Sequence, residues 1–371
     1  MLTPQYLQRV PTAMVDLYGE AEAAILEDMA RRINGYDMFI TSAQHQLQML
    51  EEMGAAREEI VGQLARLTGK SNRELEQIMR EAGMEAIRAD DMVYRAAGLN
   101  PAPLSASPVM QRTLQAGLTK TKGLFDNLTR TTANTASRQF ERALDLAYMQ
   151  VTSGAFSPQE AVKRAVRDLC RQGVAAIDYP SGRRDNMDVA VRRAVVTGVN
   201  QTAMQLQTVR ADELGVDLVE TTAHAGARPS HAEWQGQIFS RSGRSRKYPD
   251  FVSSTGYGTG PGLGGWNCSH SFRPYVEGMP RTYSKELLRE YEAQDYEYNG
   301  RKMTEYDALQ RQREIERNIR RWKREKQALG AIGGDTSEAA AKLRRWNAAQ
   351  ADFLEQTGLK RQRSREAVPK P

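Results

Sequence analysis

The spacing of apolar residues predicts helices over most of the first 214 residues. In the first predicted helix, apolar side chains recur every three or four positions at Met14, Leu17, Ala21, Ile25 and Met29. That is the period of one face of an α-helix, and Asn34-Gly35 is a typical helix end. The same criterion predicts helices at about 42–53, 60–67, from 71 onward, 109–152, 158–171 and 187–213.

Local signals suggest where these helices begin and end. Gly54 is expected to stop the second helix, and the capping box that starts at Ser71 is expected to open another. Ser157-Pro158 is an N-cap followed by a proline at the first helical position. The proline-rich stretch 98–108 predicts a linker, and 178–184 predicts a loop.

The character of the chain changes after Gly215. The stretches 217–223 and 271–276 are rich in β-branched or aromatic residues and predict two strands. Between Gly226 and Gly265 the chain carries nine glycines, which favours ordered loops over regular structure. We therefore expect a small α+β module here.

A second helical pattern follows residue 283. Its seam contains Ile315, Ile319, Trp322, Lys326 and Leu329. The glycine-rich stretch 330–335 interrupts it, and the next helix has an inner face formed by Leu343, Trp346, Gln350, Phe353 and Leu354. Two helices of similar length joined by a short glycine loop predict an antiparallel hairpin.

These patterns together predict a mainly α fold with a small α+β module. The helical N-terminal two-thirds precede a glycine-rich module of short strands, and an antiparallel helical hairpin closes the chain. The expected parts are a helical region at 1–98, a linker at 99–108, a helical region at 109–214, the module at 215–280, and the basic hairpin and tail at 281–371.

Charge is distributed unevenly along the 371 residues. The net charge is +6, but residues 301–371 hold 18 basic and 10 acidic residues, a net charge of +8. The first 300 residues are close to neutral, so uniform coating of nucleic acid is excluded, while a contact of the C-terminal hairpin with DNA phosphate or an acidic partner stays open. The candidate contacts are Arg317, Arg320, Arg321, Lys323, Arg324, Lys360, Arg361 and Arg363.

The composition also indicates the cellular compartment in which the protein is made. No apolar run is long enough to span a membrane, and the first residues do not resemble a signal peptide. The two cysteines cannot form a disulfide framework, so we expect synthesis in a reducing cytosol.

Histidine and cysteine are concentrated in the glycine-rich module. Three of the four histidines, His224, His231 and His270, lie within 47 residues, and Cys268 is two positions from the last. Two pairs of nitrogen or sulfur ligands separated by a loop form a possible structural zinc site. A network of hydrogen bonds is the alternative. A metal-dependent hydrolase would further need a base, for which Glu233 is the nearest candidate.

Two other catalytic interpretations have weaker support. The glycine-rich stretch 256–265 has no Gly-Lys-Ser/Thr sequence and no βαβ context, which argues against a nucleotide site. Glu290 and Glu292, with Ser254 and Thr255, faintly resemble an ADP-ribosyltransferase pattern, but such a pair arises easily by chance in a charged helix.

Three blocks of sequence resemble a known family. They are 190–202 (AVRRAVVTGVNQT), 214–236 (LGVDLVETTAHAGARPSHAEWQG), and 248–251 (YPDF) followed by 255–272 (TGYGTGPGLGGWNCSHSF). Together they are similar to the phage minor capsid protein 2 family of tailed bacteriophages and prophages. The C-terminal segments 315–325, 344–346 and 357–361 fit the same family, and one departure is Ser269, where family members commonly have arginine.

The resemblance implies a low-copy structural protein of the phage head, related in role to the Mu F-like head morphogenesis proteins. Such proteins associate with the portal vertex during procapsid assembly, so the expected partners are the portal, capsid and scaffold proteins. The expected location is the virion, after synthesis in the bacterial cytoplasm. The family has no established catalytic activity, which implies a protein that is not an enzyme, and His224, His231, Cys268 and His270 match the core of its motif.

Two functional hypotheses follow. The first is a structural head protein whose basic hairpin contacts packaged double-stranded DNA or an acidic partner. The second is an enzyme packaged with the genome, either a metal-dependent hydrolase or a transferase-like effector.

Overall fold

The computed structural model describes residues 1–178 and 184–369 as two compact units. Unit 1 contains Met1–Met14, Asn72–Leu124 and Arg192–Gln310, and unit 2 contains Val15–Ser71, Phe125–Val191 and Arg311–Pro371. Residues 179–183, where a loop was predicted, lie outside the described residues. The five-part division of the sequence stays a prediction.

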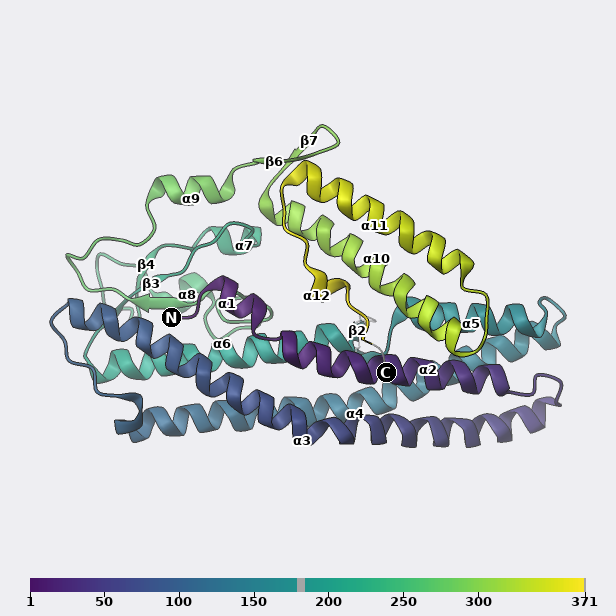
Figure 1. The fold of residues 1–371 in the computed structure, drawn as a ribbon. Helices are drawn as coiled ribbons and strands as arrows, with labels where there is room; N and C mark the ends of the chain where they lie inside the picture. The colour runs from purple at the N-terminus through teal and green to yellow at the C-terminus, as the bar shows by residue number, and fades with distance from the viewer. Residues whose placement is uncertain (179–183, 370–371) are drawn as a thin grey trace. The chain divides into compact units, whose positions relative to one another are not determined.

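Helices dominate both units, which confirms the mainly α prediction (Figure 1). In chain order they are α1 (Pro4–Arg9), α2 (Thr12–Gly35), α3 (Ser42–Ala96), α4 (Pro108–Thr152), α5 (Pro158–Gln172), α6 (Met187–Glu213), α7 (Pro229–Ala232), α8 (Phe251–Thr255), α9 (Lys285–Glu292), α10 (Glu305–Ala331), α11 (Ser337–Thr357) and α12 (Arg363–Glu366). A short 3-10 helix, Leu104–Ala106, lies between α3 and α4. None of the helices among the described residues has a span long and apolar enough to cross a membrane.

The helix predictions fail at one place. The three helices predicted between residues 42 and 96 are a single helix of 55 residues. Gly54 does not end it, because a helical glycine costs only about 1 kcal/mol and apolar packing along α3 outweighs that cost. Ser71 is not a cap either, since its hydroxyl donates a hydrogen bond to the carbonyl of Thr68 inside the helix.

Three small antiparallel sheets accompany the helices. In unit 1, β3 (Leu218–Thr221) lies between β4 (Ile238–Ser240) and β5 (Phe272–Pro274), so both predicted strands are confirmed and β4 is an addition. Unit 1 also holds the hairpin of β6 (Tyr296–Tyr298) and β7 (Arg301–Met303). Unit 2 holds β1 (Ala175–Asp178) paired with β2 (Arg184–Asn186).

In unit 1, the three-stranded sheet packs with α8 and the glycine-rich loops against α6 (Figure 1). Their common core contains Met204 of α6, Val219, Trp234, Phe239, Phe251, Leu263, Cys268 and Phe272. Most of these side chains come from loops or very short elements. Because the strands contribute few ladder hydrogen bonds, this core and its side-chain hydrogen bonds must hold the module together.

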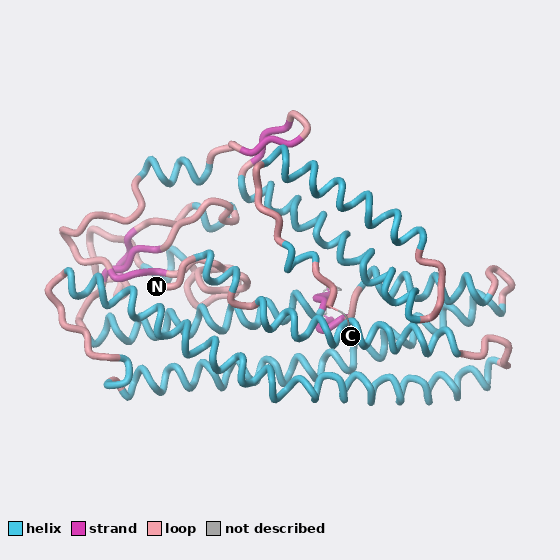
Figure 2. Tube along the Cα trace, in the orientation of Figure 1, coloured by secondary structure: helices cyan, strands magenta, loops and turns pink. Residues whose placement is uncertain are grey.

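In unit 2, α10 and α11 form the predicted antiparallel hairpin, visible in Figure 2 as two adjacent cyan helices joined by a short loop. Ile315, Ile319, Trp322 and Leu329 are buried as expected, but Lys326 is exposed. Glu325 occupies the buried position beside it and pairs with Arg167 of α5 at 2.9 Å. The seam of α10 is therefore partly ionic.

Candidate metal centre

The candidate centre is built at the edge of the three-stranded sheet of unit 1. His231 lies in the single turn of α7, after the loop that leaves β3, and Cys268 and His270 lie just before β5. All three side chains are buried. Segments 37 residues apart in sequence are thus brought to one point.

The glycine-rich loop 256–265 explains how the chain returns to this point. A Cβ atom on Gly262 would collide with the carbonyl of Gly256, and one on Gly265 would collide with that of Gly260. The backbone NH groups of Leu263, Gly265 and Trp266 donate hydrogen bonds to the carbonyls of Thr255, Gly262 and Gly260. These NH groups are therefore engaged inside the loop, which agrees with the sequence argument against a phosphate-binding loop.

Three potential metal ligands converge in the centre. The two imidazole Nδ1 atoms of His231 and His270 lie 3.4 Å apart, and the Sγ atom of Cys268 lies 3.7 Å from each of them. No further histidine, cysteine, aspartate or glutamate from the described part of the chain joins this group. The structure thus brings together three of the four residues singled out from the sequence.

Hydrogen bonds on the far side of each ring fix the tautomers. The Nε2 atom of His231 lies 2.8 Å from the carbonyl oxygen of Pro261, and the Nε2 atom of His270 lies 3.2 Å from Oε1 of Gln235. Both acceptors are oxygens, so each ring donates its Nε2–H. Each Nδ1 therefore carries a lone pair directed into the centre.

Burial keeps these groups in their neutral forms. It lowers the pKa of His231 and holds the pKa of His270 well below the usual range, with the neighbouring histidines adding to the second shift. Burial also raises the pKa of the Cys268 thiol. A neutral imidazole is the form that binds a metal, whereas the thiol must lose its proton on binding.

His224 is adjacent to the centre. Its ring is tilted by 32° against that of His270, with 4.4 Å between ring centroids. Its Nδ1–H donates to the carbonyl of Ala225 at 2.7 Å, and its Nε2 is buried with no partner among the described residues. The fourth predicted residue is therefore a neighbour whose free acceptor atom needs a donor or a metal.

Helix α6 supports the centre from one face. The side-chain amide of Asn200 donates to the carbonyls of Cys268 (3.2 Å) and His270 (2.8 Å). One and two turns later, Met204 packs in the module core and Gln207 donates to the carbonyl of Phe272 at 2.6 Å. Asn200, Met204 and Gln207 are spaced by four and three residues, so they lie on one face of α6. This face holds the backbone of the Cys268–His270 segment and of the strand residue Phe272 that follows it. Asn200 and Gln207 were not predicted as supporting residues, although two amides on the same face of a predicted helix were a usable signal.

The residues proposed for catalysis lie elsewhere in unit 1. Glu233 is exposed, and no carboxylate of the described chain joins the buried His/Cys group. Glu290 and Glu292 are exposed on α9, whereas Thr255 is buried and its hydroxyl donates to the carbonyl of Phe251. None of these carboxylates is therefore placed at the centre as a base.

Five of the eight candidate DNA contacts interact with other residues of unit 2, and the remaining three are exposed surface residues. Arg320 pairs with Asp188, Arg324 with Glu22 and Arg361 with Glu366, and Lys323 donates to the carbonyl of Glu366. Arg321 lies over the ring of Trp322 at 4.5 Å. Arg317, Lys360 and Arg363 are exposed. Arg324 is itself buried, so much of the positive charge of the hairpin is used inside unit 2.

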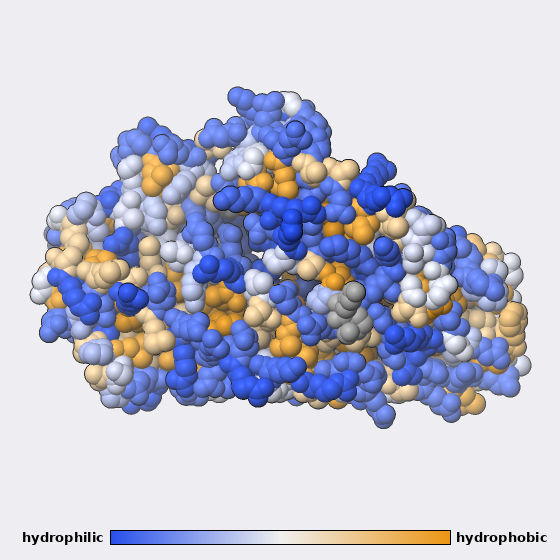
Figure 3. Space-filling model, viewed as in Figure 1, coloured by the Kyte–Doolittle hydropathy of each residue, from blue (hydrophilic) through white to orange (hydrophobic). Residues whose placement is uncertain are grey.

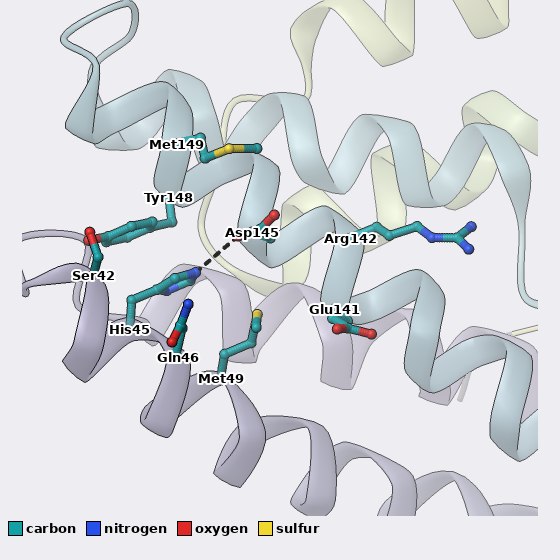
Figure 4. A pocket seen from close by; sticks show the side chains of 9 residues that line it. All are labelled: Ser42, His45, Gln46, Met49, Glu141, Arg142, Asp145, Tyr148 and Met149. Atoms are coloured by element: carbon teal, nitrogen blue, oxygen red, sulfur yellow. Dashed lines mark hydrogen bonds and ion pairs between the residues drawn. The ribbon is translucent and has the colours of Figure 1, made fainter.

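The fourth histidine belongs to a different site, in unit 2. His45 forms hydrogen bonds with the Tyr36 hydroxyl (2.7 Å) and with Asp145 (3.2 Å). Figure 4 shows the contact with Asp145 and the ring of Tyr148, on which the imidazole stacks. His45, Asp145 and Tyr148 line a cavity of about 400 Å³ between α3 and α4. Every ring nitrogen of His45 is engaged in these contacts, so the arrangement clamps the two helices together.

Comparison with known proteins relates the chain to structural proteins of phages. A "Structural protein" of Lactococcus phage LL-H is 26% identical over 300 residues, which cover 77% of this chain and 78% of that protein. A "Structural protein" of Lactococcus phage mv4 is 34% identical over 125 residues, covering 33% of this chain and 93% of that protein. No solved structure matches the chain.

The comparison with families is more specific. The family described as phage minor capsid protein 2 matches residues 2–355, and the chain belongs to this family. The resemblance drawn from the three sequence blocks is confirmed. The match spans both units, the His/Cys module and most of the C-terminal hairpin.

Proposed function

We propose that this protein is a structural component of a phage virion, a minor protein of the head that associates with the portal during procapsid assembly. The observation that carries the proposal is the family match over residues 2–355. The names of the two Lactococcus phage relatives support a structural role. The capsid and scaffold proteins are the further partners that such a role requires.

The surface of unit 2 offers apolar contacts for a protein partner. On the face drawn in Figure 3, orange apolar side chains are scattered within a mostly hydrophilic surface. Phe39, Leu47 and Leu50 are 80%, 67% and 62% exposed, and the last two lie one turn apart on α3. Exposed large apolar side chains on neighbouring turns favour a protein–protein contact, and we assign this surface to the portal contact.

Co-purification tests the proposal. The full chain, co-expressed with the portal protein encoded in the same phage genome, should sediment with the portal. The triple variant F39S/L47S/L50S should lose at least about tenfold in affinity, since tenfold corresponds to about 1.4 kcal/mol and truncating a single hot-spot side chain costs about 2 kcal/mol or more.

The matched control is M84S/M92S/V252S, which replaces three similarly exposed apolar residues of unit 1. This variant should bind the portal like the original chain. Absence of the protein from purified virions by mass spectrometry would refute the structural role, and equal loss in both triple variants would refute the assigned contact surface.

The proposal includes a contact between the C-terminal hairpin and packaged DNA. Its support is the net charge of +8 in residues 301–371 together with the exposure of Arg317, Lys360 and Arg363. Such a contact is electrostatic, so it should not depend on DNA sequence and should weaken with salt.

A charge-reversal variant tests the DNA contact. R317E/K360E/R363E should reduce the slope of log affinity against log salt by about 3, because each lost phosphate contact contributes about 0.9. The control R112E/R138E/R244E changes three exposed basic residues outside the hairpin. Point substitutions are preferable to deleting α10, since Arg324 is part of the interior of unit 2. Equal slopes for the original chain and R317E/K360E/R363E would refute this contact.

A further inference from the structure

The His231, Cys268 and His270 cluster has a geometry that a hydrogen-bond network does not require. We propose that Nδ1 of His231, Sγ of Cys268 and Nδ1 of His270 bind a Zn²⁺ ion that fastens the glycine-rich module. This inference is independent of the portal and DNA contacts proposed above, because it concerns one chain alone.

The distances between the three atoms match those of a zinc site. Zinc bonds of about 2.0–2.1 Å to nitrogen and about 2.3 Å to sulfur, at tetrahedral angles, place two nitrogens about 3.4 Å apart and a nitrogen and a sulfur about 3.6 Å apart. The structure has 3.4 Å between the two Nδ1 atoms and 3.7 Å from Sγ to each of them. A single ion can therefore bind all three atoms without moving the backbone.

The hydrogen bonds behind the rings also favour a cation in the centre. Because Pro261 and Gln235 accept the Nε2 protons, neither ring offers a proton to the 3.4 Å gap between the two Nδ1 atoms, and the single thiol proton of Cys268 can satisfy only one of them. Two buried acceptors at this distance repel each other, and a bound cation converts the repulsion into two coordinate bonds. Metal-binding histidines typically donate their other ring NH to a carbonyl or amide oxygen in this way.

The chemistry of the ligands selects zinc. Imidazole nitrogens and a thiolate are borderline or soft ligands, which suit Zn²⁺ and do not suit Mg²⁺ or Ca²⁺. All three side chains are buried, as expected for a site that stabilises a fold. Bound zinc would join α7 to the segment before β5 across the glycine loop, where few ladder hydrogen bonds exist.

We assign the fourth ligand to His224, whose side chain must rotate to reach the ion because its ring nitrogens lie outside the group formed by the other three residues. Its ring lies against that of His270, and its buried Nε2 has no partner in the described chain. Rotation of this side chain would satisfy the orphan nitrogen and close the tetrahedral set. A structural zinc site normally has four protein ligands, and this histidine accounts for the fourth.

Metal content of the full chain tests the proposal. Protein purified without a metal-affinity tag should contain one zinc per chain by plasma mass spectrometry. C268A, H231A and H270A should each contain less than about a tenth of that amount. The matched controls are C170A, which removes the other buried thiol, and H45Q, which changes the histidine of unit 2. Both controls should retain one zinc.

A second measurement uses the original chain, so that the proposal can still be tested if the variants fail to fold. The original chain is stripped with a chelator, and its melting temperature is measured with added Zn²⁺ and with added Mg²⁺. Zinc at micromolar concentration should raise the melting temperature by several degrees, and millimolar magnesium should not, because ligands that bind only the folded state stabilise it. A folded chain that contains no zinc and shows no shift with added zinc would overturn the proposal.

Cobalt substitution and His224→Ala address the fourth ligand. A four-coordinate cobalt site with a thiolate gives tetrahedral visible bands and a sulfur-to-cobalt charge-transfer band. H224A should weaken zinc binding by about 10–100-fold and reduce the tetrahedral bands while retaining the sulfur band. Unchanged zinc affinity and an unchanged cobalt spectrum in H224A would overturn the assignment of this histidine.

Discussion

At the scale of single residues, Asn200 is the side chain that fixes the His/Cys segment most directly. It is fully buried in α6 and donates hydrogen bonds to the carbonyls of both Cys268 and His270. Removing the amide leaves two buried acceptors without a donor, and each such loss costs about 1–3 kcal/mol.

We expect N200A to lower the free energy of unfolding by about 2–4 kcal/mol, measured by urea denaturation in zinc-containing buffer. The control is Q201A on the same helix, which loses a hydrogen bond to the carbonyl of Gly264 from a half-buried position and an exposed one from the Lys120 ammonium. It should cost less than about 1 kcal/mol. Equal losses in the two variants would show that Asn200 has no special part in holding the segment.

At the scale of elements, α4 and α6 of unit 1 approach each other through reciprocal glycine and threonine pairs. The hydroxyl of Thr121 donates to the carbonyl of Gly117, and that of Thr202 donates to the carbonyl of Gly198, each at 2.8 Å within its own helix. A Cβ atom on Gly117 would collide with the Thr202 side chain, and one on Gly198 would collide with Thr121. The helix that carries Asn200 is therefore held against α4 at a distance that only glycine permits.

This contact predicts opposite effects for two glycines of α4. G117A should destabilise the protein by about 1–3 kcal/mol through overpacking. Gly123 has open space where its Cβ would lie, so G123A should stabilise by about 0.5–1 kcal/mol through helix propensity. Thermal denaturation measures both effects. Adding T202A to G117A should restore part of the loss, and a stabilising G117A would contradict the close contact.

The elements also show what periodicity and local signals can predict. The bounds of α2, α4, α5 and α6 follow from the helical period with its caps, as at Ser157, whose hydroxyl accepts from the NH of Glu160. Local stop signals were misleading in α3, because tertiary packing outweighs the cost of Gly54. The hairpin β6–β7 was missed, although Asn299-Gly300, both with positive φ, is a strong signal for a two-residue turn.

The sequence allowed the residues of the candidate site to be named, but not their arrangement in space. Clustering of His224, His231, Cys268 and His270 in the sequence indicated the segments that meet in the structure at His231, Cys268 and His270. Which nitrogen faces the centre depends on Pro261, Gln235 and Asn200, and these contacts span up to 70 residues of chain. Sequence spacing carries no information about such partners, so only the structure separates the three ligands that already converge from His224, which must rotate to join them.

At the scale of the whole molecule, the C-terminal positive charge has a structural use. Within unit 2, Arg324 of α10 pairs at 2.6 Å with Glu22 of α2, and both side chains are buried. Glu22 also accepts a hydrogen bond from the NH of Val174, immediately before β1. The ion pair therefore connects the hairpin to a helix about 300 residues away in sequence, so α10 is part of the core of unit 2.

Replacing one partner of this ion pair should lower the free energy of unfolding far more than replacing both. R324L leaves the Glu22 carboxylate buried without its counterion, which costs about 3–5 kcal/mol, while the double variant E22L/R324L removes both charges and should recover most of that stability. Urea denaturation of the two single variants and the double variant measures the coupling free energy. R317L, an exposed arginine of the same helix, is the control and should change stability by less than about 0.5 kcal/mol. If R324L were as mild as R317L, the hairpin would be an appendage whose charge is free for DNA, and its assignment to the core of unit 2 would be wrong.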